Sequence, residues 1–187
     1  MRNKIIALSL LIAAGLFADE DLEINGEFKL LNEAKNAPVG WEKSSAGQPG
    51  VGTFRVVAAR ESDENAVLIT AQRRITALRT SKSFPVRPGN KVRLEVDVKG
   101  KGTAGVGLAL YSADGAHITD IVVAKGMALP HKFLNIKGRC IISNEYAVKR
   151  NGKTVRLVPA SLRVFFFAGR ESEITFENVE AEVDSGS

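Results

Sequence analysis

The sequence predicts an all-β fold, either a sandwich or a barrel. Short segments rich in Val, Ile, Leu and Phe alternate with Gly, Pro, Asn and Asp at intervals of roughly ten residues. After the N-terminal apolar run, no segment sustains the apolar period of about 3.6 residues that marks an amphipathic helix. Short strands separated by turn residues in this way are typical of antiparallel sandwiches and barrels.

The segment from Lys91 to Lys99 shows the alternation of a half-buried strand most clearly. Its apolar positions are Val92, Leu94, Val96 and Val98, and the positions between them are Arg93, Glu95 and Asp97. Because successive side chains of a strand point to opposite faces, the apolar residues share one face and the charged residues the other. Pro88-Gly89 predicts a turn that leads into this strand.

Two dipeptides, Asp114-Gly115 and Asn151-Gly152, predict tight turns because both types readily adopt a positive φ. The strands that they connect are Val106–Leu110 with Ile118–Val123, and Tyr146–Arg150 with Thr154–Val158. The sequence therefore predicts two β-hairpins in the second half of the chain.

Two further strands are expected toward the C-terminus, at Leu162–Phe167 and Ile174–Val183, with a connection at Gly169–Ser172. The apolar positions early in the last of these strands are Ile174, Phe176 and Val179. The alternation therefore slips by one residue, which predicts a β-bulge near Asn178.

Four other features of the mature chain are expected from local sequence. Local propensity favours a short helix over Thr70–Thr80, and the Gly and Pro content of Gly47–Gly52 predicts a surface loop. Phe28 and Trp41 follow glycine-containing bends and are expected to turn into the core, where an aromatic side chain buries about 150–250 Å².

The N-terminus has the order of charge and hydropathy of a secretory signal. Arg2 and Lys4 precede the apolar run Ile5–Phe17, and acidic residues follow from Asp19. The run is shorter than the ~20 residues that a membrane-spanning helix needs. We expect residues 1–18 to be a signal peptide cleaved after Ala18, and residues 19–187 to form a single secreted or periplasmic β-sandwich domain. The alternative is a buried N-terminal helix.

Composition excludes some classes of partner. The chain has 26 cations and 21 anions, and two of the cations lie in the signal. No run of like charge stands out, and the densest basic stretch, Arg73–Arg87, lacks interleaved stacking aromatics before Phe84, so we expect no nucleic-acid binding. No stable insertion into a membrane is expected either. Cys140 is the only cysteine, so the domain must be held by its core, and a buried, inert thiol is expected.

The order of several motifs resembles a known family. The motifs are Asn25–Phe28, Pro38–Trp41, Phe84–Val92, Val96–Gly100 and Ile174–Val179. Together they resemble the carbohydrate-binding modules of the galactose-binding-like jelly-roll superfamily, of the type of families four and nine, over nearly the whole mature chain. The resemblance implies a jelly-roll β-sandwich, galactose-binding-domain-like, that recognises glycan through one sheet face without catalysing a reaction.

The resemblance also implies a structural calcium ion, held by acidic residues of the first and last strands. Calcium takes six to eight oxygen ligands, several of them anionic. Glu27 and Glu177 are the acidic residues available at the matching places, while Lys29 stands where a ligand is expected and would repel the ion. Exposed charges at strand ends are the alternative interpretation of both glutamates. Calcium is the one cofactor that the resemblance implies.

Sugar recognition needs aromatic surfaces beside polar groups that match hydroxyls. Tyr111 and Tyr146 combine a ring with a polar tip, and Tyr111, on the face opposite Leu110, is the better candidate. The candidate ligand-binding residues are Tyr111, Tyr146, Arg79, Arg93 and Asp97, with the three charged residues lining a polar groove on one sheet. A half-buried tyrosine and ordinary solvated strand charges explain the same residues without a ligand.

No catalytic arrangement is evident in the sequence, and we expect no enzyme. The carboxylates Glu95, Asp97 and Asp120 could be named for acid-base catalysis, but no spacing places two of them across a cleft. His117 and His131 have no neighbouring pattern of metal ligands. The sequence leaves two functions open: glycan recognition, or an extracellular or periplasmic protein-interaction or structural β-sandwich that binds no sugar.

Overall fold

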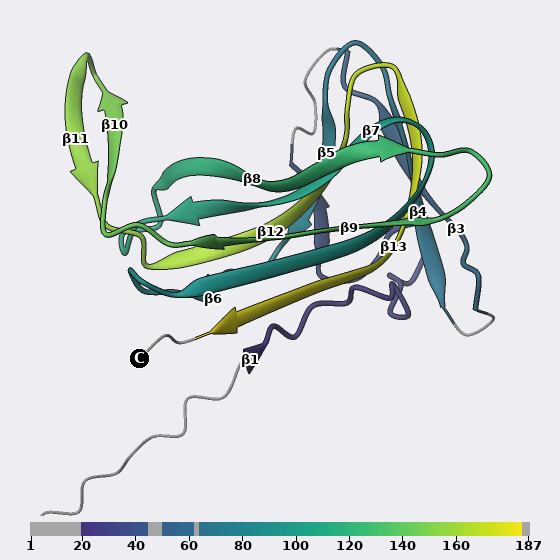
Figure 1. The fold of residues 1–187 in the computed structure, drawn as a ribbon, viewed down its shortest axis with the longest axis horizontal. Helices are drawn as coiled ribbons and strands as arrows, with labels where there is room; N and C mark the ends of the chain where they lie inside the picture. The colour runs from purple at the N-terminus through teal and green to yellow at the C-terminus, as the bar shows by residue number, and fades with distance from the viewer. Residues whose placement is uncertain (1–19, 45–49, 62–63, 185–187) are drawn as a thin grey trace, which may run out of the picture.

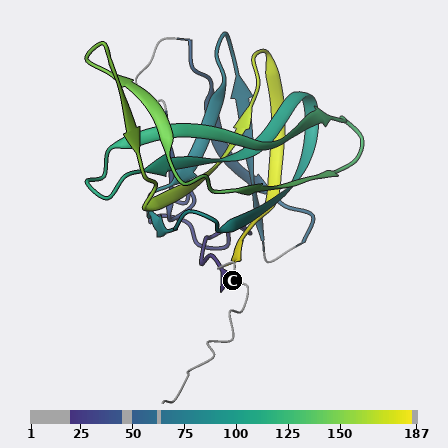
Figure 2. The same ribbon diagram turned by 60° about the vertical axis from the view of Figure 1, so that its left-hand side comes forward.

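The computed structural model describes residues 20–44, 50–61 and 64–184, and they form two antiparallel β-sheets packed face to face (Figures 1 and 2). The first sheet consists of β3 (Thr53–Ala58), β4 (Asn65–Ala71), β13 (Ser172–Asp184), the first half of β7 (Lys91–Tyr111) and β9 (Leu134–Ile141), in this order, with β1 (Glu20–Asp21) paired to the end of β13. The second sheet consists of β2 (Trp41–Lys43), β5 (Thr76–Thr80), β12 (Ser161–Ala168), the second half of β7 and β8 (His117–Ala128), with β6 (Phe84–Pro85) paired to the start of β12. The predicted all-β sandwich is therefore confirmed.

Strand β7 curves through the fold and belongs to both sheets (Figure 1). Its pairing changes from one sheet to the other at Gly100–Gly102. Gly100 has φ +146° and Gly102 has φ +114°, which residues with a Cβ rarely adopt. A Cβ on Gly100 would also lie 2.1 Å from the carbonyl oxygen of Glu173. The two glycines thus allow one long strand to pair with β13 and β9 before the bend and with β12 and β8 after it.

The predicted strands and turns are largely confirmed. The four alternate valine and leucine positions of Lys91–Lys99 are completely buried. Gly115 has φ +78° in the turn between β7 and β8, and Asn151 and Gly152 both have a positive φ between β10 (Tyr146–Arg150) and β11 (Lys153–Leu157). This second hairpin forms a separate two-stranded ribbon that stands away from the sandwich (Figure 1).

The core between the sheets contains an aromatic cluster, as predicted for Phe28 and Trp41. The ring centroids of these two residues are 5.9 Å apart, and Phe166 packs against both at 5.7 and 4.9 Å. Phe176 contacts Phe166 from the opposite sheet at 4.8 Å. The Trp41 indole donates a hydrogen bond to the carbonyl oxygen of Asn25 at 2.9 Å, so its polar group is satisfied inside the core.

The predicted bulge of the last strand is also confirmed. The register between β13 and β7 shifts between Glu177 and Glu180, and Asn178 has φ +49°. The shift keeps Phe176 and Val179 buried on the same side although they are three residues apart. It follows that Glu177, next to Phe176 in sequence, lies on the outer side of the first sheet.

One expectation about secondary structure is wrong, and one about burial holds only in part. Thr70–Thr80 contains no helix: it comprises the end of β4, a connection and β5. Thr76, Leu78 and Thr80 are buried alternately against the core, and this tertiary burial overrides local helix propensity. Cys140 is only half-buried on β9, and its partial burial raises the pKa of its thiol.

Some expectations concern residues outside the described ranges. They are the signal peptide at residues 1–18 and most of the predicted loop at Gly47–Gly52, of which only Gly50, Val51 and Gly52 are described. Within the described residues, no helix is long and apolar enough to cross a membrane.

Candidate functional site

The outer side of the second sheet carries an apolar cluster of its own, separate from the core. Strand alternation places Leu162, Val164, Phe166 and Ala168 of β12 in the core. Phe165 and Phe167 therefore point to the other side, where they pack with Ala77 of β5 and with Ala109 and Tyr111 of β7. We call these five residues, together with the charged Glu42, Arg79 and Arg163, the aromatic face.

Glycines of β7 make room for the two phenylalanine rings. Phe165 pairs with Gly107 and Phe167 with Gly105, and a Cβ on either glycine would lie about 2.5 Å from the opposite ring. The rings pack against the backbone of β7, and only 9% of Phe165 and 6% of Phe167 is exposed. Tyr111, which is only half-buried, is the ring of the cluster that combines access to solvent with a polar tip.

Three charged side chains from three strands surround Tyr111. Arg79 of β5 and Arg163 of β12 both donate hydrogen bonds to the same oxygen, Oε1 of Glu42 on β2, at 2.9 and 2.8 Å. Arg79 also donates to the Tyr111 hydroxyl at 3.3 Å. The guanidinium carbon of Arg163 lies 5.4 Å from the centre of the Tyr111 ring, within the range of a cation–π contact.

The other side of Tyr111 borders β8 and the projecting hairpin. The His117 ring meets the Tyr111 ring edge-on, with centroids 5.5 Å apart, and its Nε2 lies 2.8 Å from Oδ1 of Asp120. Arg150 of β10 donates a hydrogen bond to the backbone carbonyl of His117 at 3.4 Å. Aromatic carbon, cationic donors and a carboxylate therefore converge around one tyrosine.

The structure brings together two of the five predicted ligand-binding residues, Tyr111 and Arg79. The expectation that Arg79 shares a sheet with Arg93 and Asp97 is wrong, because β7 crosses between the sheets after these two residues. Tyr146 lies on β10, where its ring packs against the core and its hydroxyl accepts a hydrogen bond from the backbone N–H of Ser143 at 3.2 Å.

Arg93 and Asp97 belong to an ion-pair network on the outer side of the first sheet. Arg93 lies 3.3 Å from Glu95 and 3.4 Å from Glu182. Arg60 bridges Asp97 and the buried carboxylate of Glu177, with 2.6 Å between its Nε and Glu177 Oε2. Asn135 and Asn178 add hydrogen bonds to Asp97. We call Arg60, Arg93, Glu95, Asp97, Glu177 and Glu182 the ion-paired face.

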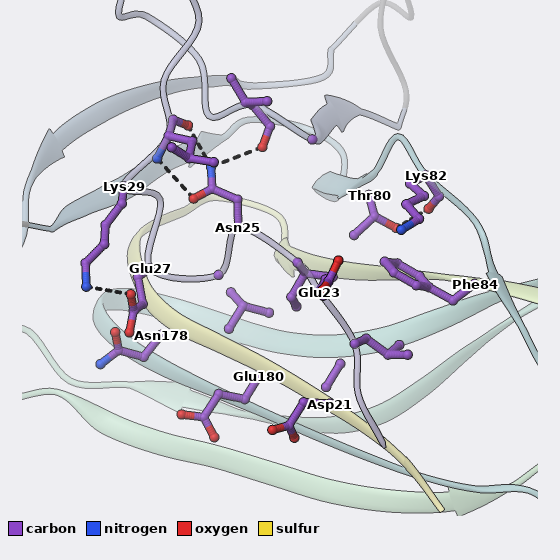
Figure 3. A pocket seen from close by; sticks show the side chains of 18 of the residues that line it. Asp21, Glu23, Asn25, Glu27, Lys29, Thr80, Lys82, Phe84, Asn178 and Glu180 are labelled. Carbon is purple, nitrogen blue, oxygen red and sulfur yellow. Dashed lines mark hydrogen bonds and ion pairs between the residues drawn. The ribbon is translucent and has the colours of Figure 1, made fainter. Parts of the chain in front are cut away.

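The two candidate calcium ligands are both engaged by cations. Glu27 pairs with Lys29 at 2.7 Å (Figure 3), and the oxygens of Glu177 accept hydrogen bonds from the backbone N–H and Nε of Arg60. These contacts with Glu177, and those with Asp97, raise the pKa of Arg60. In the described ranges, no three His, Cys, Asp or Glu side chains are grouped to hold a metal. A calcium ion bound by Glu27 and Glu177 would have to displace Lys29 and Arg60.

An open groove with acidic walls runs between residues 21–30 and the end of β13 (Figure 3). Its acidic lining residues are Asp21, Glu23, Glu27, Glu61, Glu64, Glu180 and Glu182. Desolvation and the carboxylates of Glu95 and Glu182 raise the pKa of Glu180. The Asn25 side chain, which also lines the groove, is held by hydrogen bonds with the backbone of Leu30 and Val39.

Sequence reasoning missed six residues of the aromatic face: Glu42, Ala77, Ala109, Arg163, Phe165 and Phe167. A usable signal existed for the phenylalanines, because three consecutive Phe residues in a strand must place at least one ring on each face. The convergence of Glu42 with Arg163 has no local signal, since 121 positions separate them.

Comparison with known proteins identifies the fold. No protein-family profile and no curated protein sequence matches the chain. Among solved structures, the xylan-binding CBM22-1 domain of Xyn10C from Paenibacillus barcinonensis is similar, with a TM-score of 0.57 and 11% identity over 87% of this chain and 94% of that domain. The family 11 carbohydrate-binding module of Lic26A-Cel5E from Clostridium thermocellum gives 0.54 and 12%, over 88% and 94%. The chain has the jelly-roll fold of carbohydrate-binding modules.

The likeness extends to a module within a larger enzyme. In Clostridium thermocellum xylanase 10B, crystallised as CBM22-1 and GH10 modules with xylohexaose, the match has a TM-score of 0.57 and 11% identity and covers 91% of this chain. The chain spans only 28% of that larger protein. The jelly-roll sandwich implied by the motif order is thus confirmed, and the similar solved structures include carbohydrate-binding modules of families 22 and 11.

Proposed function

We propose that this chain is an exported, non-catalytic glycan-binding module and that the aromatic face holds the sugar. The observation that carries the proposal is the position of Tyr111, which lies on an outer sheet face between Arg79 and Arg163 on one side and His117 on the other. Solved proteins of the same fold include a domain described as xylan-binding, which makes xylan the first polysaccharide to test.

The chemistry of the face suits a pyranose ring. One side of a sugar ring presents C–H groups that pack on an aromatic surface, and its rim presents hydroxyls that donate and accept hydrogen bonds. Tyr111 offers the surface, the two guanidinium groups offer donors, and Glu42, with 42% of its side chain exposed, offers an acceptor. These groups come from β2, β5, β7 and β12 of a hydrogen-bonded sheet, so their spacing is fixed before a ligand arrives.

A non-catalytic role accords with the partners of the carboxylates. Hydrolysis of a glycosidic bond ordinarily uses two carboxyl groups on either side of that bond. At the aromatic face, Glu42 is bound by two arginines and Asp120 by His117. Glu42 is therefore committed to ion pairs with the two arginines, and Asp120 to a contact with the His117 ring.

The test measures the binding of polysaccharides to residues 19–187 by isothermal titration calorimetry and affinity electrophoresis. The panel is xylohexaose, xylan, mixed-linkage glucan and galactan, titrated against the unaltered protein and against Tyr111→Ala. We expect the unaltered protein to bind at least one of these glycans, and the Tyr111→Ala variant to bind the same glycan about tenfold more weakly. Phe133→Ala is the matched control, because Phe133 is a half-buried aromatic residue beside Arg60 of the ion-paired face, and its loss should leave binding unchanged. Absence of binding across the panel, or full affinity in a folded Tyr111→Ala variant, would refute the proposal.

Export is a part of the proposal with its own measurement. We propose that residues 1–18 direct secretion and that cleavage follows Ala18, since cations, an apolar run and acidic residues occur there in the order of a signal peptide. The intact mass of protein recovered outside the cytoplasm should match a chain that begins at Asp19. Recovery of the full-length chain in the cytoplasm alone would contradict export.

A second candidate is a protein-interaction sandwich, favoured by exposed apolar side chains along β8 and just beyond it. Val122, Met127 and Leu129 are 50%, 63% and 41% exposed. Such residues would contribute to a contact with another protein if they form a continuous patch. Binding of a purified extracellular protein that is lost in Met127→Lys, together with no glycan binding, would favour this candidate.

A further inference from the structure

The charges of the aromatic face do not balance, and the excess is positive. Arg79 and Arg163 share a single carboxylate, and both use the same oxygen of it. Asp120 of the neighbouring strand β8 contacts His117, and within the described residues it forms no ion pair with either arginine. A ligand with a carboxylate of its own would neutralise the excess positive charge of the two arginines.

We propose that the aromatic face binds an acidic glycan, a chain that carries the carboxylate groups of uronic-acid residues. This inference rests on the proposed function and specifies its ligand. The carboxylate would lie against the Arg79 and Arg163 guanidinium groups while a sugar ring of the same chain packs on Tyr111.

The two guanidinium groups have N–H donors that make no hydrogen bond to a described protein group. Each arginine carries five N–H donors. Arg79 uses one on Glu42 and one on Tyr111, and Arg163 uses one on Glu42 and one on Ser83. Six of the ten donors therefore make no hydrogen bond to a described protein group, which is enough for a bidentate contact with a carboxylate.

The partial burial of Arg79 and Arg163 strengthens a contact with a ligand carboxylate. The side chains of Arg79 and Arg163 are only 30% and 25% exposed, beside the rings of Tyr111 and Phe165. Partial exclusion of water lowers the local dielectric and so increases the attraction between a guanidinium group and an incoming anion. Glu42 and the Tyr111 ring also fix the plane of Arg163 in advance, which reduces the entropy lost on binding.

The ion-paired face lacks this capacity, although it too contains two arginines. Arg60 and Arg93 each contact two carboxylates, so a further anion would have to compete with groups already in place. The proposal therefore assigns the acidic glycan to the aromatic face and not to the ion-paired face.

The test compares acidic polysaccharides with their own carboxyl-reduced forms. Glucuronoxylan, polygalacturonate and alginate would each be titrated against residues 19–187, before and after conversion of every uronate to the neutral hexose. We expect at least one of the acidic polymers to bind about tenfold more tightly than its reduced form, and the difference to shrink in 0.5 M NaCl. Arg163→Gln, which removes the charge and keeps hydrogen-bonding groups, should weaken binding of the acidic polymer more than binding of its reduced form, so that the difference between the two is abolished.

The outcomes separate the inference from the proposed function. Equal or tighter binding of the reduced polymers would overturn the acidic preference and leave glycan binding standing. Absence of binding to every acidic, reduced and neutral polymer would overturn both. Arg139→Gln, an exposed residue on the outer side of the first sheet, is the matched control and should retain the full preference. Dextran sulfate that binds as tightly as the preferred uronate polymer would show attraction to any polyanion and would also overturn the inference.

Discussion

The two sheets share strand β7 and enclose one core, yet their outer faces use arginine in opposite ways. On the ion-paired face, Arg60 and Arg93 each hold two carboxylates. On the aromatic face, Arg79 and Arg163 share one carboxylate beside Tyr111. In the first arrangement the cations are satisfied by the protein itself, which suits a structural role. In the second they retain N–H donors that bond to no described protein group, as the proposed ligand contact requires.

The difference depends on the bend at Gly100–Gly102. A β7 that stayed in one sheet would present Arg93, Asp97 and Tyr111 on the same surface, since all three occupy odd-numbered positions. The two glycines instead divide the strand, so that its charged half joins the first sheet and Tyr111 the second. A single pair of residues thus separates the ion-paired residues from the residues proposed to bind the ligand.

The largest expected effect comes from adjacent phenylalanines of β12 that lie on opposite sides of the second sheet. Phe166→Ala removes a completely buried ring that contacts Phe28, Trp41 and Phe176, and should lower the free energy of unfolding by about 3–5 kcal/mol. Phe165→Ala should cost about half as much or less, because water can occupy the space at the outer surface. Urea unfolding of both variants measures the two losses, and equal losses would contradict the assignment of Phe165 to an outer face.

The next effect compares one arginine from each face. Arg60→Met leaves the Glu177 carboxylate, 3% exposed, without its guanidinium partner, and removal of one partner from a buried pair costs about 3–5 kcal/mol. Because about half of the Arg60 side chain is exposed, we expect a loss near 2 kcal/mol. Arg163→Met leaves Glu42 paired with Arg79 and should cost less than about 1 kcal/mol. A greater loss of stability in Arg163→Met than in Arg60→Met would reverse the roles assigned to the faces.

Much of the fold follows from local sequence. The alternation of Lys91–Lys99 and the Asn151-Gly152 turn are confirmed because both depend on neighbours in the chain. The bulge at Asn178 is confirmed because the slip in alternation is itself a local signal. The helix expected over Thr70–Thr80 was wrong because burial between sheets, a tertiary effect, determines that segment.

The candidate site follows from the sequence only in part. The side of β7 that carries Tyr111 could be predicted from alternation, but its neighbours could not, because Glu42, Arg79 and Arg163 meet only after β2, β5 and β12 have paired. The placement of Arg93 and Asp97 failed for a related reason: alternation gives the face of a strand, and it does not reveal that the strand leaves its sheet at Gly100–Gly102.

The smallest expected effect is a pH dependence near the ion-paired face. Desolvation and the carboxylates of Glu95 and Glu182 raise the pKa of Glu180 above its ordinary value of 4.5. The folded state then binds a proton more tightly than the unfolded state, so this contribution to stability is complete below about pH 4.5 and is lost as the pH rises through the raised pKa.

Glu180→Gln removes that dependence. Relative to the unaltered protein, the variant should therefore gain stability as the pH increases from 4 to 7, as measured by urea midpoints at several pH values. Glu173→Gln, an exposed position on the same strand, serves as the control and should show no such trend. A stability difference between Glu180→Gln and the unaltered protein that stays constant from pH 4 to 7 would refute the expected sign.

The central claim is that ligand binds on the aromatic face, and β7 allows it to be tested within one strand. Backbone chemical shifts of residues 19–187 would be recorded while glucuronoxylan fragments, or the tightest ligand of the panel, are added. We predict perturbations in the half of β7 that ends at Tyr111, in β5 around Arg79 and in β12 around Arg163, with little change from Lys91 to Lys99. Perturbations that instead centre on Arg93, Asp97 and β13 would place the ligand on the ion-paired face and contradict the account.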